Sequence, residues 1–330
     1  MTGRTKLSTI APALKRSFIP KSCPRRTPPA GSRSQARTFG DIARIRTAKG
    51  DVDAALQLHQ EELTIYEALG DKRSRAVTLG DIARIRRAKG DVDAALQLHQ
   101  ERLAIVEALG DKRSRAITLG DIARILRDKG DVDAALQLHQ ERLAIYEALG
   151  DKRERAVTLG DIARIRTAKG DVDAALQLHQ EVLAIYEALG DKRERAVTLG
   201  DIARIRTAKG DVDAAVQLQN ERLAVNHELG DQDGIAAATY DLAQIEIQQE
   251  KWPEAFEHLA EAYDIFNKIG RLDFICTVGS SLGLLLCRAG QREQGLQMLT
   301  RSRDGFAKLG LQDHAKQTEA IIAQISQSAG

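Results

Sequence analysis

One arginine and one aspartate recur together every 40 residues along most of the chain, and three positions separate them. The arginines are Arg44, Arg84, Arg124, Arg164 and Arg204, and the aspartates are Asp41, Asp81, Asp121, Asp161 and Asp201. A guanidinium group binds a carboxylate through two parallel hydrogen bonds. An exposed Asp–Arg pair on one helix instead contributes only about 0.2–0.5 kcal/mol. Two interpretations therefore stay open, a row of carboxylate-binding groups or a solvated charged surface.

A second periodic series consists of histidines. They are His59, His99, His139 and His179, and Gln219 occupies the next equivalent position. Packed helices lie roughly 8–10 Å apart, whereas a zinc–nitrogen bond is about 2 Å long, so histidines of successive repeats should not share an ion. Glutamine can also make the hydrogen bonds of a neutral imidazole. We therefore predict that these side chains pack between helices and form no metal site.

The remaining polar motifs do not indicate catalysis. Asp51 and Asp53, with their copies, resemble the start of a calcium loop, but no Gly or terminal Glu follows at the required spacing. Helix capping explains both acids. The sequence has no phosphate-binding glycine loop, no nucleophile motif and no isolated pair of carboxylates. We predict that the protein is not an enzyme and requires no cofactor.

A 40-residue repeat organises these side chains. The units begin at residues 38, 78, 118, 158, 198, 238 and 278, and the last two have diverged. Glycines occur every 20 residues from Gly50 to Gly230, and an aspartate follows each of them. Glycine readily ends a helix in the left-handed conformation, and aspartate caps the next helix. Each unit therefore contains two helices of about 16 to 18 residues, within the usual range.

The helices are amphipathic and cannot be stable alone. In the second unit, Leu79, Ile82 and Ile85 share one face of the first helix. Val92, Leu96 and Leu103 share one face of the second. Because neither helix can bury its apolar stripe alone, neighbouring repeats must stack. We predict an all-α solenoid of helix–turn–helix repeats.

Three regions are predicted along the chain. Residues 1–37 form a disordered, basic, proline-rich arm, 38–311 form seven repeats, and 312–330 form a C-terminal capping helix (about 312–326) and tail. Residues 1–40 hold nine Lys and Arg and no Asp or Glu, and five of the six prolines lie in the arm. Such a segment has little to bury. A targeting segment and a start-site artefact remain open for it.

Charge and cysteine content limit the classes of function. Beyond residue 40 the chain holds 40 basic and 47 acidic side chains, a net charge of −7. Nucleic acid is therefore an expected partner only through the arm. The three cysteines lack metal or redox spacing, which favours a reducing compartment. No apolar run approaches the roughly 20 residues of a membrane span. We expect a cytoplasmic protein with no membrane partner.

The repeats resemble the tetratricopeptide repeat family. The positions where that family has apolar and small residues carry Ile82, Ala83 and Ala95, and the diverged repeats carry Ala243, Ala255, Gly283 and Gly295 among others. The 40-residue period and the phrase HQERLAIYEALGDKRERA are similar to a long-repeat subgroup. That subgroup includes spindle-orientation adaptors, and kinesin light chains and bacterial signalling proteins are similar. The resemblance implies a right-handed superhelical solenoid that binds protein or peptide on its concave face.

Two positions depart from the family pattern. The first helix has arginine where the family commonly has tyrosine, at Arg46, Arg86, Arg166 and Arg206, with Leu126 in the third repeat. The second helix replaces a usual alanine by Glu62, Arg102, Arg142, Val182 or Arg222. Long stems can be buried while the charged heads reach a rim. We predict that these charged heads lie at the rim; a role in setting repeat register stays open.

The resemblance also locates a binding site. In this family the first helices line the concave groove, and the long-repeat adaptors commonly use an asparagine there to bind peptide backbone. This chain has arginine at that position. We predict a scaffold or adaptor that binds an acidic peptide through Arg44, Arg84, Arg124, Arg164, Arg204, Asp81, Asp121, Asp161 and Asp201. The alternatives are a sensor part of a larger signalling enzyme or ATPase system, or nucleic-acid binding through the arm.

Overall fold

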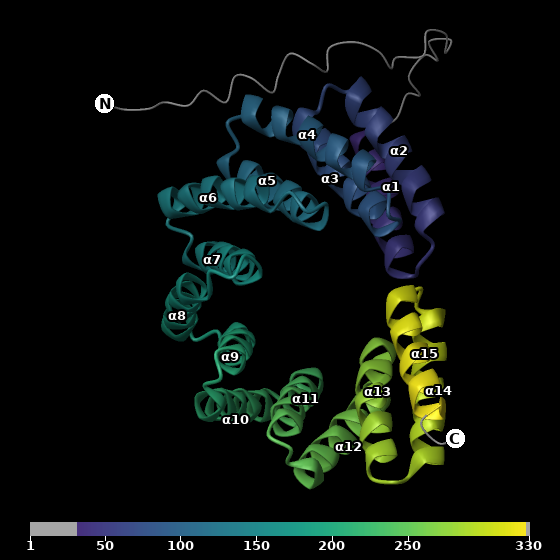
Figure 1. Ribbon diagram of the computed structural model, residues 1–330. Coiled ribbons are helices and arrows are strands. Elements are labelled where there is room, and N and C mark those ends of the chain that lie inside the picture. The colour runs from purple at the N-terminus through teal and green to yellow at the C-terminus, as the bar shows by residue number, and fades with distance from the viewer. Residues whose placement is uncertain (1–31, 328–330) are drawn as a thin grey trace. The chain divides into compact units, whose positions relative to one another are not determined.

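The computed structural model describes residues 32–327 and consists there of helices joined by short turns, without a strand. Most of the predicted arm, residues 1–31, lies outside the described residues. Fifteen helices follow one another (Figure 1). They are α1 (Arg33–Ala48), α2 (Val52–Ala68), α3 (Lys72–Ala88), α4 (Val92–Ala108), α5 (Lys112–Asp128), α6 (Val132–Leu149), α7 (Lys152–Ala168), α8 (Val172–Leu189), α9 (Lys192–Ala208), α10 (Val212–Leu229), α11 (Gln232–Gln248), α12 (Trp252–Ile269), α13 (Leu272–Arg288), α14 (Arg292–Lys308) and α15 (Gln312–Gln327). The predicted all-α repeat architecture is confirmed.

The glycine–aspartate pairs separate the helices as predicted. Gly150 ends α6 with φ 66°, a left-handed conformation that favours glycine. Asp151 then caps α7, because its side chain accepts a hydrogen bond from the backbone N–H of Glu154 at 3.2 Å. The backbone N–H of Asp151 donates to the carbonyl of Tyr146 at 3.1 Å and so closes the end of α6.

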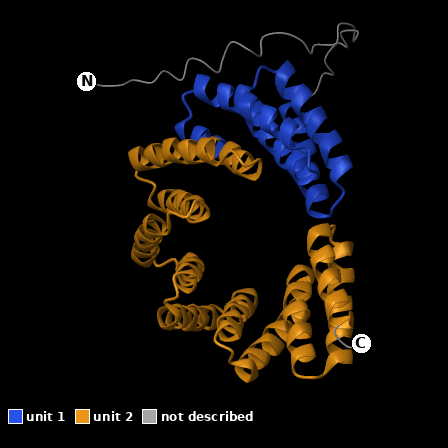
Figure 2. Ribbon diagram, viewed as in Figure 1, with its two compact units in different colours: residues 1–118 blue, residues 119–330 orange. Residues whose placement is uncertain are grey.

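Helices that are adjacent in the chain pack against each other. The chain divides into two compact units, residues 1–118 and 119–330, and the division falls within α5 (Figure 2). In the first unit α1 packs on α2, α2 on α3 and α3 on α4. In the second unit the same sequential packing runs from α6 to α15. The first helices α3, α7, α9, α11 and α13 are thus each held between the second helices that precede and follow them.

The first helix begins earlier than the sequence pattern predicted. Helix α1 starts at Arg33, inside the segment assigned to the arm, and Ser32 caps it by accepting from the N–H of Gln35. Ala36 is fully buried against α2 in a cluster with Ile65 and Tyr66. The assignment of residues 33–37 to the arm was therefore wrong. The sequence pattern placed the start of the first unit at Thr38. That boundary follows the repeated motif and leaves out the first turn of α1, which precedes it.

Small residues allow the helix pairs to approach closely. A methyl group added at Gly295 on α14 would lie 2.5 Å from the carbonyl oxygen of Gly283 on α13 and 2.8 Å from the amide nitrogen of Cys287. Ala83 and Ala95 are likewise completely buried. The largest core cluster lies in the diverged repeats and includes Leu259 and Phe266. Close backbone approach therefore explains the small residues at these positions.

Candidate functional site

Among the residues predicted to bind a peptide, the five arginines are exposed and the four aspartates are largely buried. The side chains of Arg44, Arg84, Arg124, Arg164 and Arg204 are between 39% and 66% exposed. Those of Asp81, Asp121, Asp161 and Asp201 are only 9–14% exposed. All lie on the first helices α1, α3, α5, α7 and α9. We call this surface, considered separately in each unit, the first-helix face.

Within a repeat, each of these arginines pairs with the aspartate three residues before it. The contacts are Arg44–Asp41, Arg84–Asp81, Arg124–Asp121, Arg164–Asp161 and Arg204–Asp201. Some arginines also reach the next repeat. Arg44 Nη2 lies 3.1 Å from Asp81 Oδ2, and Arg164 Nη2 lies 3.1 Å from Asp201 Oδ2. Ion pairs therefore connect successive first helices within each unit.

The electrostatics of Arg44 show how these pairs are balanced. Partial burial lowers the pKa of Arg44, but the carboxylates, Asp81 above all, raise the pKa overall. The guanidinium therefore stays charged and is held in place. A charged guanidinium that aspartates already hold in place loses little side-chain freedom on binding. It is therefore suited to bind an external carboxylate.

The second-helix charges do not lie at a rim. The side chain of Arg142 on α6 is only 4% exposed, and that of Glu62 on α2 is equally buried. Arg142 Nη1 donates to Asp161 Oδ2 at 3.0 Å and Nη2 to Glu154 Oε2 at 3.3 Å, both on α7. Its guanidinium carbon lies 5.5 Å from the Tyr146 ring centre. For this second-helix position the rim prediction was wrong, because the next repeat supplies carboxylates inside the interface. For the first-helix position it agrees with the structure, where the side chains of Arg46, Arg86, Arg166 and Arg206 are 30–46% exposed. We call the space that Arg142 fills the arginine slot.

The equivalent slots hold different side chains. In the fifth repeat, Arg222 Nη1 donates to Asp241 Oδ2 at 2.7 Å and to Gln219 Oε1 at 3.2 Å. In the first repeat, Glu62 pairs instead with His59, at 2.8 Å from Nδ1 to Oε2. In the fourth repeat the position is Val182, which is 3% exposed. The side chain at this position therefore varies between otherwise similar repeats.

The four histidines are buried, each with at most 2% of the residue exposed. Burial lowers the pKa of His139 to about 4, although the nearby Asp161 opposes the shift. Burial also lowers the pKa of His179. The part of the chain that the structure describes contains no group of three or more side chains arranged to hold a metal ion. The predicted packing position is thus observed directly.

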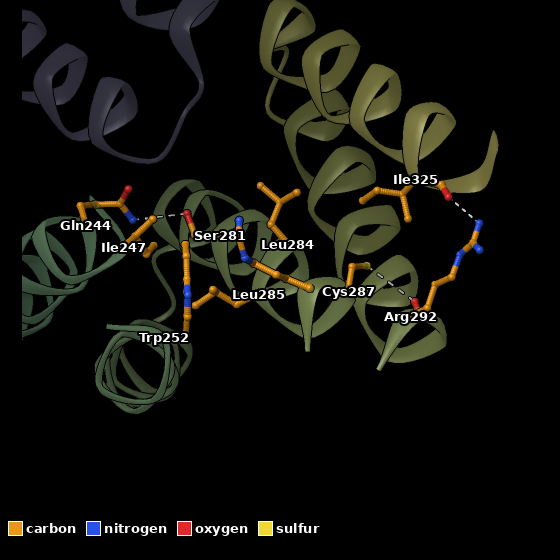
Figure 3. A pocket seen from close by; sticks show the side chains of 10 residues that line it. Gln244, Ile247, Trp252, Ser281, Leu284, Leu285, Cys287, Arg292 and Ile325 are labelled. Carbon is orange, nitrogen blue, oxygen red and sulfur yellow. Dashed lines mark hydrogen bonds between the residues drawn. The ribbon is translucent and has the colours of Figure 1, made fainter. Parts of the chain in front are cut away.

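A pocket that the sequence did not reveal lies where the Arg–Asp series ends. Its lining residues come from α11, α12, α13, α14 and α15, and Figure 3 shows Trp252 and Leu284 among them. Its volume is about 560 Å³. The guanidinium of Arg288 lies 3.9 Å from the Trp252 ring centre. The replacement of the repeated arginine by Gln244 and Leu284 is the sequence signal that indicates this change from a charged to an apolar surface.

No described helix is both long and apolar enough to cross a lipid bilayer.

Comparison with curated proteins found no match. A family model described as tetratricopeptide repeat matches the chain five times. The matched segments are residues 34–108, 76–148, 114–188, 154–227 and 194–268. These matches cover the repeats on both sides of the unit division.

Solved structures of helical repeat proteins are similar. A kinesin light chain-like protein of Podosopora anserina with nearly identical TPR-like repeats is 25% identical, with a TM-score of 0.51, covering 60% of this chain and 97% of that one. A STAND protein with a tetratricopeptide repeat sensor from Pyrococcus horikoshii is 14% identical, with a TM-score of 0.63, covering 89% and 47%. A Rap protein complexed with Competence and Sporulation Factor is 14% identical, with a TM-score of 0.55, covering 90% and 99%.

Proposed function

Because the chain belongs to the tetratricopeptide repeat family, we propose that it is a non-enzymatic scaffold that binds an acidic protein segment on its first-helix face. The coarser part of this function, protein interaction, follows from the family. The finer part, recognition of carboxylates by the repeated arginines, is the proposal. An extended segment with several Asp or Glu residues is the ligand that this arrangement favours.

One observation carries the proposal. Each of the first helices α3, α5, α7 and α9 presents an exposed arginine whose aspartate partner three residues earlier is only 9–14% exposed, and in α1 the exposed Arg44 pairs with the largely buried Asp81 of α3. A guanidinium has five N–H donors. Arg164 uses three of its nitrogen atoms on Asp161 and Asp201, each through one bond, so two N–H groups are left for an external acceptor. The internal carboxylates orient the arginine without using all of its donors.

The same pairing limits the affinity of each contact. A ligand carboxylate must share the guanidinium with aspartates that already neutralise its charge. Exposed ion pairs contribute about 0.2–1 kcal/mol each, so recognition requires several repeats at once. Five such contacts contribute about 1–5 kcal/mol in total, whereas a micromolar Kd corresponds to about −8 kcal/mol, so these ion pairs alone support binding weaker than micromolar. Binding should also weaken with added salt.

The test uses the full chain and a fluorescent peptide in which glutamate and glycine alternate. The variant combines Arg124→Ala and Arg164→Ala, which both lie in the second unit. We expect peptide affinity to fall at least about tenfold, equivalent to 1.4 kcal/mol, with unchanged helix content. The matched control combines Lys169→Ala and Lys209→Ala, which removes the same charge from helix ends where the lysines pair with Asp133 and Asp173.

The control should bind within about twofold of the parent if the effect is local and not a general response to net charge. Equal affinities of the arginine variant and the parent would show that the arginines form only a solvated surface. A parent that does not bind the peptide would refute the acidic-ligand proposal. The binding partner itself can then be identified by affinity capture with the full chain.

A further inference from the structure

The fourth repeat retains the surroundings of the arginine slot but lacks its arginine. The third and fourth repeats, residues 118–157 and 158–197, differ at four positions, and Arg142 versus Val182 is one of them. Around Arg142 lie His139, Tyr146, Glu154 and Asp161. The equivalent residues around Val182 are His179, Tyr186, Glu194 and Asp201. The groups that accompany a buried guanidinium are therefore all present in the fourth repeat.

The missing side chain leaves a cavity. A space of about 190 Å³ is lined by Gly160, His179, Val182, Glu194 and Asp201, among other residues. A methyl group added at Gly160 would meet nothing within 4 Å, whereas at the equivalent Gly120 it would lie 3.1 Å from Arg142 Nη1. A water molecule occupies about 30 Å³ in the liquid, so the cavity has room for the four heavy atoms of a guanidinium group.

One polar group that lines this cavity, the carboxylate of Glu194, lacks the contact that the equivalent Glu154 makes with Arg142. His179 is 2% exposed, and its Nδ1 has no hydrogen-bond partner within residues 32–327, which is equally true of His139 beside Arg142. In the fifth repeat the equivalent Gln219 accepts from the slot guanidinium. Glu154 pairs with Arg142, whereas the carboxylate of Glu194 has no cationic partner in the described part of the chain. The half-buried carboxylate of Glu194 thus lacks the guanidinium that its equivalent Glu154 has, which favours entry of a cation.

Arg164, the exposed arginine of the same repeat, bonds one of the carboxylates that a slot arginine would bond. Asp161 Oδ2 accepts from Arg142, but the equivalent Asp201 Oδ2 accepts from Arg164 at 3.1 and 3.3 Å. An entering guanidinium would replace Arg164 at Asp201 and leave Arg164 bonded to Asp161 Oδ1, as it already is at 3.3 Å. After this exchange Asp161 and Asp201 would each still have an arginine partner, and Glu194 would gain one.

We propose that the cavity at Val182 binds the guanidinium group of an arginine side chain from a peptide on the first-helix face. The cavity reaches that face, since Val197 and Arg164, which help to line it, are 43% and 49% exposed. A planar guanidinium can bond Asp201 and Glu194 with different nitrogen atoms, as Arg142 does with Asp161 and Glu154. An ammonium has a single nitrogen and cannot copy this fork. The proposal does not depend on the acidic-peptide function.

The test is a titration with a blocked Gly-Arg-Gly tripeptide, followed by NMR of the valine methyl groups. We expect saturable shifts at Val182 and Val197, and binding at least tenfold weaker for the same tripeptide with citrulline or lysine. Val182→Arg supplies the guanidinium from within the chain and should abolish binding while the variant remains folded. Glu194→Gln should weaken binding at least threefold.

A matched gain-of-function variant completes the experiment. Arg142→Val opens the equivalent slot in the third repeat, so the stoichiometry should rise from one tripeptide to two. Absence of saturable shifts in the parent, unchanged binding by Val182→Arg, or equal binding of the citrulline tripeptide would each overturn the proposal. Tighter binding of free arginine than of the blocked tripeptide would refute a peptide as the source. None of these outcomes depends on whether acidic peptides bind.

Discussion

Arg142 on α6 donates to Asp161 on α7, with Nη1 and Oδ2 3.0 Å apart, and so a buried ion pair joins two consecutive repeats. Removing one partner of a buried pair costs about 3–5 kcal/mol because the other charge stays buried without compensation. Glu154, its second partner, is 35% exposed, which reduces this cost. We therefore expect Arg142→Met to lower the free energy of unfolding by about 2–3 kcal/mol, measured by urea denaturation.

The control for Arg142→Met is Arg164→Met, because the side chain of Arg164 is 49% exposed. Exposed pairs contribute little, so this control should change the free energy of unfolding by less than about 1 kcal/mol. Equal effects of the two substitutions would show that Arg142 does not stabilise the repeat interface beyond an ordinary surface pair.

Two helix glycines should respond in opposite directions to alanine. At Gly295 the new methyl group would collide with the backbone of α13, because the carbonyl of Gly283 would lie only 2.5 Å away. We expect Gly295→Ala to destabilise the protein by about 1–3 kcal/mol. Gly160→Ala meets nothing within 4 Å and should stabilise α7 by about 0.5–1 kcal/mol. Thermal melting of both variants tests this, and a destabilising Gly160→Ala would contradict the open space beside α7.

Glu250 occupies a helix-ending position that glycine holds in the earlier repeats. Its φ is 60°, and it is the one non-glycine residue with positive φ in the described part of the chain. A left-handed conformation costs residues with a Cβ roughly 1–2 kcal/mol. We expect Glu250→Gly to raise the free energy of unfolding by about 1 kcal/mol, with Glu250→Ala as the control that lacks this gain. A variant no more stable than Glu250→Ala would show that this backbone carries no strain.

The buried His139 should make stability depend on pH. Its pKa falls from 6.5 to about 4 through burial. Between these pH values the unfolded chain binds a proton that the folded chain does not. Stability is therefore lost as pH falls from 6.5 toward 4, by at most about 3 kcal/mol from this residue. His139→Gln, which copies Gln219, should remove this part of the pH dependence in denaturation curves. Parallel curves for variant and parent would contradict it.

The C-terminal repeats are predicted to act as a cap. Removing residues 271–330 deletes α13–α15 cleanly after α12 and exposes Phe266, which is fully buried and stacks on Phe274 with ring centres 4.7 Å apart. Terminal repeats with a polar outer surface keep solenoids soluble. We expect the truncated chain to aggregate or to melt at a clearly lower temperature. Removal of 328–330 alone is the control and should have no effect.

Much of the fold could be predicted from the sequence because its signals are local. Glycine and aspartate at a 20-residue spacing determine where helices end and begin, and the apolar periodicity determines which faces are buried. The burial of His59 and its copies followed from the same periodicity. Each of these inferences depends on residues within one or two helical turns of each other, where backbone preference and side-chain direction act directly.

The pairing of charges was decided only by the tertiary structure. Arg142 and Arg164 are the same residue type, and Asp161 and Asp201 are equivalent in the repeat. Yet Asp161 accepts a hydrogen bond from Arg142, whereas Asp201 accepts one from Arg164, because Val182 leaves the slot beside Asp201 empty. Partners 19 or 37 residues apart meet only when α6, α7, α8 and α9 have packed. The energy of a buried charge depends on which groups surround it in space, and a repeat pattern along the chain does not specify that.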